Sequence, residues 1–214
     1  MRIAIAGGHG NIARRLTRLL VDRGDSPRSL IRNPAHADEL SELGASPVVC
    51  DLEAATEGEV AAAVGSVDAV VFSAGAGPGS GPDRKWTMDY GGVVKLIEAA
   101  KANGVTRFLL VSSMGADADA EGNEGFAVYL RAKGKADDEL RASGLDYTIV
   151  RPTGLTDEPG SGRVTLGDGV GSGQISRDNV AAVLAASLDA PNTIGRLFEA
   201  RDGDVPVEEA VASV

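Results

Sequence analysis

Six short apolar runs alternate with amphipathic helical patterns along this chain, and this alternation constrains the fold more than any other feature. The runs span residues 2–6, 28–32, 46–50, 68–74, 107–113 and 146–152. Between them, apolar residues recur at helical spacing, as in Ile12, Leu16, Leu19 and Leu20. Parallel strands need crossover connections, and helices on both faces of a sheet supply them. We therefore predict a doubly wound α/β fold built on a parallel sheet.

The length of 214 residues suits a single domain. Residues 153–214 read as loops, with "DEPGSGRV" and "GDGVGSG", before a helix near residues 177–189 and a short strand near 196–200. This stretch is too short for a second domain. We therefore expect one domain, 1–214, in which residues 153–214 form a small tail on the substrate side. The glycine-rich segment 74–83 follows the fourth strand, at the sheet edge where ligands bind in such folds.

Composition narrows the class of protein. The formal net charge is −10, and a protein that neutralises nucleic-acid phosphates needs a surplus of Lys and Arg. Cys50 is the only cysteine, which excludes an internal disulfide and a cluster of thiolate metal ligands. No apolar run reaches membrane-spanning length, and the chain opens directly on a strand pattern. We expect a cytoplasmic protein without a metal, membrane or nucleic-acid partner, whose oligomeric state, monomer or dimer, stays open.

The first strand runs into "AGGHGNIA", in which Gly7, Gly10 and Ala13 form the pattern G-x-x-G-x-x-A. Small residues at a strand-to-helix turn let the main chain approach a diphosphate, and the helix that follows presents its amide groups and positive dipole end. Asn11 and Ile12 would supply those amides. Ordinary strand-to-helix turns also use glycine, but the position at the first junction of an alternating chain favours a dinucleotide-binding Rossmann fold.

Arg32 ends the second strand, where the usual dinucleotide fingerprint has an acidic residue for the ribose 2′-hydroxyl. A guanidinium binds a 2′-phosphate through two hydrogen bonds and stays charged at any working pH. The alternative is a solvated arginine at a strand end. The pattern favours NADP(H) over NAD(H).

Candidate acid and base groups lie in "VYLRAKGK" and "LLVSSMG". Tyr129 and Lys133 are four residues apart on a predicted helix, so both side chains emerge on one face. A neighbouring ammonium makes a phenol more acidic, so Tyr129 is a candidate proton donor, and Lys133 is also a candidate ligand of the nicotinamide ribose. Ser112 or Ser113, at the end of the fifth strand, could hold a substrate oxygen, although serines at strand ends also cap turns.

Taken together, these motifs resemble the short-chain dehydrogenase/reductase superfamily, specifically its atypical members related to NmrA-like proteins and biliverdin reductase B. The resemblance runs over nearly the whole chain and includes "LIRNP", "VVCDLE", "VVFSAGAG", "YLRAKGKADDEL", "DYTIVRPTGLT" and "ISRDNVAAVL". Two positions depart from the superfamily pattern. Ala13 replaces the third glycine, and Met114 stands where the catalytic hydroxyl of many members falls.

The resemblance implies a path for the cofactor across the site. It assigns Arg32 to the adenosine phosphate. The other implied positions are Asp51 and Leu52 beside the adenine, Ser73, Ala74 and Gly75 after the fourth strand, and Pro152, Thr153 and Gly154 near the nicotinamide carboxamide.

These features predict an NADP(H)-dependent oxidoreductase that transfers hydride to a small carbonyl, quinone or flavin-like acceptor. A second reading is a regulatory protein that binds NADP(H) without turnover, as NmrA-like proteins do. A third is a sugar-nucleotide epimerase, against which the short tail argues. The sequence does not identify the acceptor.

Overall fold

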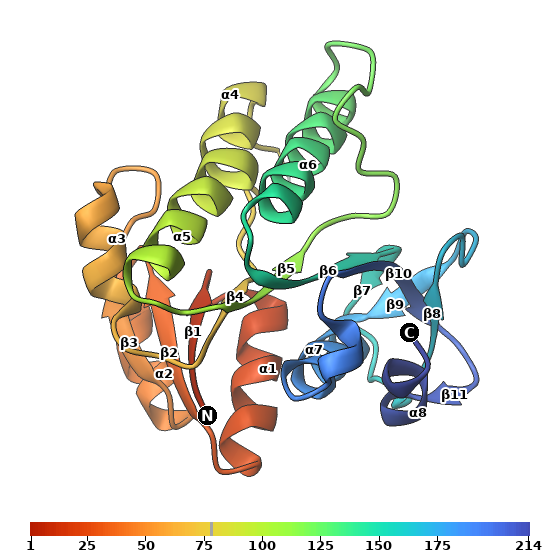
Figure 1. The fold of residues 1–214 in the computed structure, drawn as a ribbon, viewed down its shortest axis with the longest axis horizontal. Helices are drawn as coiled ribbons and strands as arrows, with labels where there is room; N and C mark the ends of the chain where they lie inside the picture. The colour runs from red at the N-terminus through yellow and green to blue at the C-terminus, as the bar shows by residue number, and fades with distance from the viewer. Residues whose placement is uncertain (78) are drawn as a thin grey trace.

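The computed structural model describes residues 1–77 and 79–214, and its strands and helices alternate as expected (Figure 1). The strands are β1 (Arg2–Ala6), β2 (Ser26–Ile31), β3 (Ser46–Val49), β4 (Ala69–Phe72), β5 (Arg107–Val111), β6 (Asp146–Pro152), β7 (Gly154–Thr156), β8 (Arg163–Gly167), β9 (Gln174–Ser176), β10 (Arg196–Asp202) and β11 (Val205–Pro206). The longer helices are α1 (Asn11–Asp22), α3 (Glu57–Val64), α5 (Gly91–Ala102), α6 (Gly125–Ala142) and α7 (Arg177–Leu188). The short ones are η1 (Pro34–His36), α2 (Ala37–Glu42), α4 (Pro82–Arg84), the π-helix η2 (Lys85–Tyr90), η3 (Pro191–Thr193) and α8 (Val207–Ala212).

Within the described residues, nine strands form one sheet in the order β11-β8-β10-β6-β5-β4-β1-β2-β3. Seven neighbouring strands, from β3 to β10, run parallel, and β8 and β11 add an antiparallel edge. The predicted doubly wound α/β fold is confirmed. The antiparallel edge was not expected from the sequence.

The core lies on both faces of this sheet because successive side chains of each strand point to opposite faces. In β1, Ile3 and Ile5 pack into the cluster that α1, α7 and α8 cover, whereas Ala4 and Ala6 pack into the cluster beneath α3, α5 and α6. All four side chains are fully buried. Burial on both faces explains why the strands read as continuous apolar runs.

The order in which strands are added to the sheet reverses between the parallel neighbours β1 and β4. From β1 the sheet continues to β2 and β3 on one side, and from β4 to β5 and β6 on the other. The loops after β1 and β4 therefore leave the same edge in opposite directions and open a crevice between them, which is the usual ligand position in such sheets. Pro78, in the loop after β4, lies outside the described residues.

Residues 153–176, which we expected to form loops, also contain three short strands. β8 joins the main sheet, while β7 and β9 pair parallel in a small sheet of their own. α7 packs beside α1 across one sheet face (Figure 1). In the part of the chain that the structure describes, no helix combines the length and the apolar character needed to cross a membrane.

Candidate functional site

The glycine turn after β1 packs tightly against the ends of two neighbouring strands. Gly7 has a φ of +75°, and a Cβ on it would lie 2.7 Å from the Cα of Ala74. A Cβ on Gly8 would lie 2.5 Å from the Cβ of Ser29. The Gly10 amide donates to the Gly7 carbonyl at 2.7 Å and closes the turn. Packing within the chain thus requires glycine at positions 7 and 8. This requirement is additional to the close approach of a diphosphate that we predicted.

α1 begins directly after this turn, and its amino end has the features of an anion site. In the described structure its N-cap, Gly10, makes no side-chain cap, and the first turn holds no acidic residue. The amides of Asn11 and Ile12 therefore lack a side-chain acceptor, and the helix dipole adds a partial positive charge. Ala13, in place of the third glycine, is fully buried in the core cluster with Ile5. Its methyl group therefore fits between helix and sheet.

A first cavity of about 360 Å³ lies on the β2 and β3 side of the turn. Its wall contains eight of the predicted residues, Gly7, Gly10, Arg32, Asp51, Leu52, Ser73, Ala74 and Gly75. The wall also contains His9 and His36, whose rings stack at 3.6 Å. The sequence gives no sign that the loops after β1 and β2 meet in this way.

Basic groups gather around the first cavity. Arg32 lies 3.6 Å from Glu53, but that carboxylate is bonded more closely by Arg84, at 3.0 Å, and by Thr87, at 2.6 Å. The Arg32 side chain is 57% exposed, so its guanidinium remains accessible to an anion in the cavity. Hydrogen bonds from Thr87 and Arg84 outweigh burial and hold the pKa of Glu53 below its usual value.

Glu39 anchors the glycine turn from α2. His9 Nε2 lies 2.7 Å from one carboxylate oxygen, and Arg14 Nη1 donates to the other at 2.6 Å. These two contacts lower the pKa of Glu39 to about 2. The turn is therefore fixed by side chains as well as by its own backbone.

A second cavity of about 890 Å³ lies on the β4 and β5 side. It contains the predicted residues Gly10, Asn11, Ile12, Ser73, Ala74, Gly75, Ser112, Tyr129 and Lys133. The two cavities share His9, Gly10, Ser73, Ala74 and Gly75. They therefore meet over the glycine turn as two halves of one cleft along the carboxyl edge of the sheet.

Tyr129 and Lys133 lie one turn apart on α6, on the predicted helix, and both line the second cavity. Lys133 Nζ donates to the Val111 carbonyl at 3.2 Å and lies 5.9 Å from the centre of the Tyr129 ring. It also lies 3.3 Å from Asp89 Oδ1, in an ion pair that lacks the alignment of a hydrogen bond. Asp89 Oδ2 accepts the Ala76 amide at 3.2 Å. Asp89 therefore connects Lys133 to the loop after β4.

The two candidate serines have different surroundings. Ser112 lines the second cavity, and its hydroxyl donates to Asp137 Oδ2 at 2.9 Å. Arg151 donates to the same oxygen at 2.9 Å. Ser113 lines neither cavity and donates to the Met114 carbonyl. Burial raises the pKa of Asp137, against the opposing contacts from Ser112 and Arg151.

The end of β6 and the start of β7, where the resemblance places Pro152, Thr153 and Gly154 near the nicotinamide carboxamide, lie outside the linings of both cavities. The Thr153 amide donates to the Ala200 carbonyl at 2.9 Å instead. β6 pairs with β10 at this point, so the chain is held in the sheet. Leu155 and Arg177 line the second cavity and were missed. The motif "ISRDNV" was the only sequence signal that included Arg177.

A family of NAD(P)H-binding proteins matches residues 7–191, and the chain belongs to this family. The resemblance to atypical short-chain dehydrogenase/reductases is confirmed by this match and by the structural relatives. A Bacillus subtilis protein named "Uncharacterized sugar epimerase YhfK" is 42% identical over 212 residues, covering 99% of each chain.

Solved structures agree with this family over the full chain. A putative NAD-dependent epimerase/dehydratase from Bacillus halodurans is 41% identical, with a TM-score of 0.92 and 100% of both chains covered. The oxidoreductase ylbE from Lactococcus lactis is 27% identical, with a TM-score of 0.86, covering 100% of this chain and 96% of that one.

Proposed function

We propose that this protein binds NADP(H) in the cleft and reduces a small carbonyl, quinone or flavin-like acceptor by hydride transfer. The observation that carries the proposal is the cleft itself. Its two halves meet over the glycine turn and the free amino end of α1, with Arg32 at one end and Tyr129 beside Lys133 at the other.

The residues present fit a dinucleotide. Ser73 Oγ is buried in the wall shared by both halves, and within the described residues it has no hydrogen-bond partner, which leaves it for a ligand. The first cavity offers Leu52 and Asp51 to an adenosine and the guanidinium of Arg32 to a 2′-phosphate. The second cavity has room for the nicotinamide and for an acceptor. When bound, NADPH supplies the hydride.

Tyr129 is the proposed proton donor to the reduced acceptor. Its side chain is half-buried in the cavity wall, and among the described residues no group bonds its hydroxyl. The ammonium groups of Lys85 and Lys133 lie 5.3 and 5.9 Å from the ring centre, so two cations stand beside the proposed proton donor. Lys133 is positioned by Asp89, and Ser112 by Asp137.

Tyr129→Phe tests this mechanism. The variant should bind NADPH as the wild type does and lose acceptor reduction by about 10²-fold or more, the usual contribution of a general acid. Tyr147→Phe, which changes a tyrosine in β6 outside both cavities, is the matched control. Unchanged turnover in Tyr129→Phe would remove the tyrosine from the mechanism.

A second candidate is a protein that senses NADP(H) without turnover. It is favoured by the commitment of the Ser112 hydroxyl to Asp137, which leaves that proton unavailable to an acceptor. NADPH binding combined with no NADPH oxidation across aldehydes, quinones, flavins and sugar nucleotides would support it. Sugar nucleotides belong in the screen because two relatives are named as epimerases.

A further inference from the structure

Arg177 brings a positive charge from the tail into the cleft. It is the first residue of α7 and lines the second cavity together with Asn11 and Ile12, at the amino end of α1. A cation in the first turn of a helix is disfavoured by the helix dipole, so this arginine does not stabilise α7. Ser176 caps the helix, accepting the Asn179 amide at 3.0 Å. The charge of Arg177 is therefore available for another purpose.

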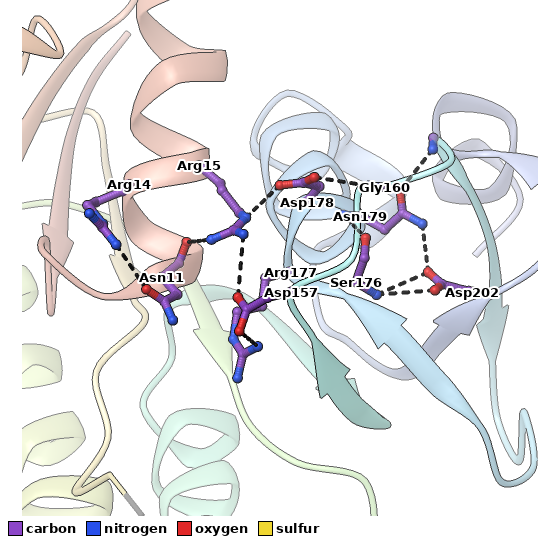
Figure 2. Close-up of polar contacts among 11 residues, drawn as sticks. Asn11, Arg14, Arg15, Asp157, Gly160, Ser176, Arg177, Asp178, Asn179 and Asp202 are labelled. Carbon is purple, nitrogen blue, oxygen red and sulfur yellow. Dashed lines mark hydrogen bonds and ion pairs between the residues drawn. The ribbon is translucent and has the colours of Figure 1, made fainter.

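The partner of Arg177 is an exposed carboxylate that a second arginine also contacts. Asp157 lies between Arg177, at 2.9 Å, and Arg15, at 3.4 Å (Figure 2). Its side chain is 61% exposed, whereas the Arg177 side chain is 22% exposed. An ion pair with one exposed partner contributes little stability, so Arg177 can leave Asp157 at low cost.

Arg15 is held by more polar partners than Arg177. Its Nε donates to Asp178 and its Nη1 donates to the Asn11 carbonyl at 3.0 Å, and α1 and α7 pack side by side (Figure 2). Among the described residues, the ion pair with Asp157 is the one polar interaction found for the guanidinium of Arg177. If Arg177 turned away, Arg15 would keep Asp157 paired.

The charge of the second cavity favours an anion. Its wall carries the cations Lys85, Lys133 and Arg177, and Asp89 is its one acidic residue within the described chain. Asp89 is already paired with Lys133. This excess of positive charge stands in a chain whose formal net charge is −10.

We propose that Arg177 binds the diphosphate of NADP(H) opposite the amino end of α1, exchanging Asp157 for it. This inference rests on the proposed function. In this arrangement the first crossover and the tail both contribute to the binding site. The amides of α1 contact one side of the diphosphate, and the guanidinium of Arg177 contacts the other.

Equilibrium binding measured by calorimetry tests the assignment with three probes: NADPH, ADP-ribose, which keeps the diphosphate but lacks nicotinamide, and 2′-AMP, which lacks the diphosphate. Arg177→Gln should weaken NADPH and ADP-ribose by about tenfold or more, as expected for a hydrogen bond between charged groups. Its affinity for 2′-AMP should stay within about twofold of the wild type. Asp157→Asn should strengthen NADPH binding by a few-fold, because it frees Arg177.

Arg163→Gln is the matched control, since Arg163 is exposed on β8 and lines neither cavity. Unchanged NADPH affinity in Arg177→Gln would overturn the inference, as would an equal loss for 2′-AMP, which would indicate damage to the whole cleft. Failure of the wild type to bind any of the three probes would instead overturn the proposed function itself.

Discussion

Replacing Asp89 by Asn isolates the energy of the buried ion pair beneath the cleft. Asn keeps the shape of the side chain and an oxygen for the Ala76 amide but removes the charge facing Lys133. The side chains of Asp89 and Lys133 are 1% and 4% exposed, so the remaining buried ammonium would lose its ion-pair partner. Removing one partner of such a pair costs about 3–5 kcal/mol.

The hydrogen bond from Lys133 to the Val111 carbonyl persists in this variant, so we expect the lower end of the range, about 3 kcal/mol. In a chain of this length, about 2–4 °C of Tm is lost per kcal/mol, which gives a decrease of roughly 6–12 °C. Urea denaturation and thermal melting at pH 7 measure both quantities. Glu98→Gln, which breaks an exposed pair with Lys101, is the control and should change stability by about 0.5 kcal/mol or less.

A double-mutant cycle measures the interaction energy between Asp89 and Lys133 apart from the other effects of each substitution. Lys133→Met alone leaves Asp89 buried without its ion-pair partner, whereas Asp89→Asn combined with Lys133→Met removes both charges of the pair. We expect the double variant to recover most of the loss, with a coupling energy of about 2 kcal/mol or more. A cost below about 1 kcal/mol for Asp89→Asn, or strict additivity of the two changes, would refute the reasoning.

Three further variants follow from the site. Glu39→Gln should destabilise the protein at neutral pH, because the folded-state pKa of about 2 lies below the ordinary value of 4.5, and this difference should vanish as pH falls from 4.5 toward 2. Thermal melting across that range measures it, and a difference independent of pH would contradict the assignment. Arg32→Gln should raise the Kd for NADPH by about tenfold or more and that for NADH by less than about twofold, whereas equal losses in a fluorescence titration would defeat the 2′-phosphate assignment. Gly7→Ala should cost about 3 kcal/mol or more in urea denaturation, because its Cβ would clash with Ala74. Gly24→Ala shares the positive φ, at +85°, but meets no neighbour within 4 Å, so it should cost about 1–2 kcal/mol, and equal costs would show that no clash occurs.

The fold was predictable because its signals are local. Each parallel strand is buried on both faces and reads as an apolar run, and each crossover helix shows its own period. The short strands of the tail carry no such signal. β7 and β9 have three residues each and stand among glycines, so their pattern does not differ from that of loops. Leu155, which lies in β7, was missed for this reason.

Side-chain partners in the site were harder to predict than its location. The spacing of Tyr129 and Lys133 placed both on one helix face, but nothing near Asp89 in the sequence reveals that η2 packs against α6. Likewise, Ser112 and Ser113 follow the last residue of β5, where the chain leaves the sheet and alternation no longer assigns a face. These pairings depend on contacts between segments far apart in the chain.

The contribution of the tail to the sheet has a consequence for biosynthesis. Residues from β8, α7, β10 and α8 complete the cluster around Ile3 and Ile5, so a nascent chain that has reached β6 has only α1 over that face. The edge of β6 also stays unpaired until β10 leaves the ribosome. The interval between the synthesis of β6 and that of α8 lasts roughly 3–12 s at ordinary rates of translation. We expect chaperones to engage the emerging polypeptide during this interval, and ribosome-bound chains to become protease-resistant only after α8 has emerged.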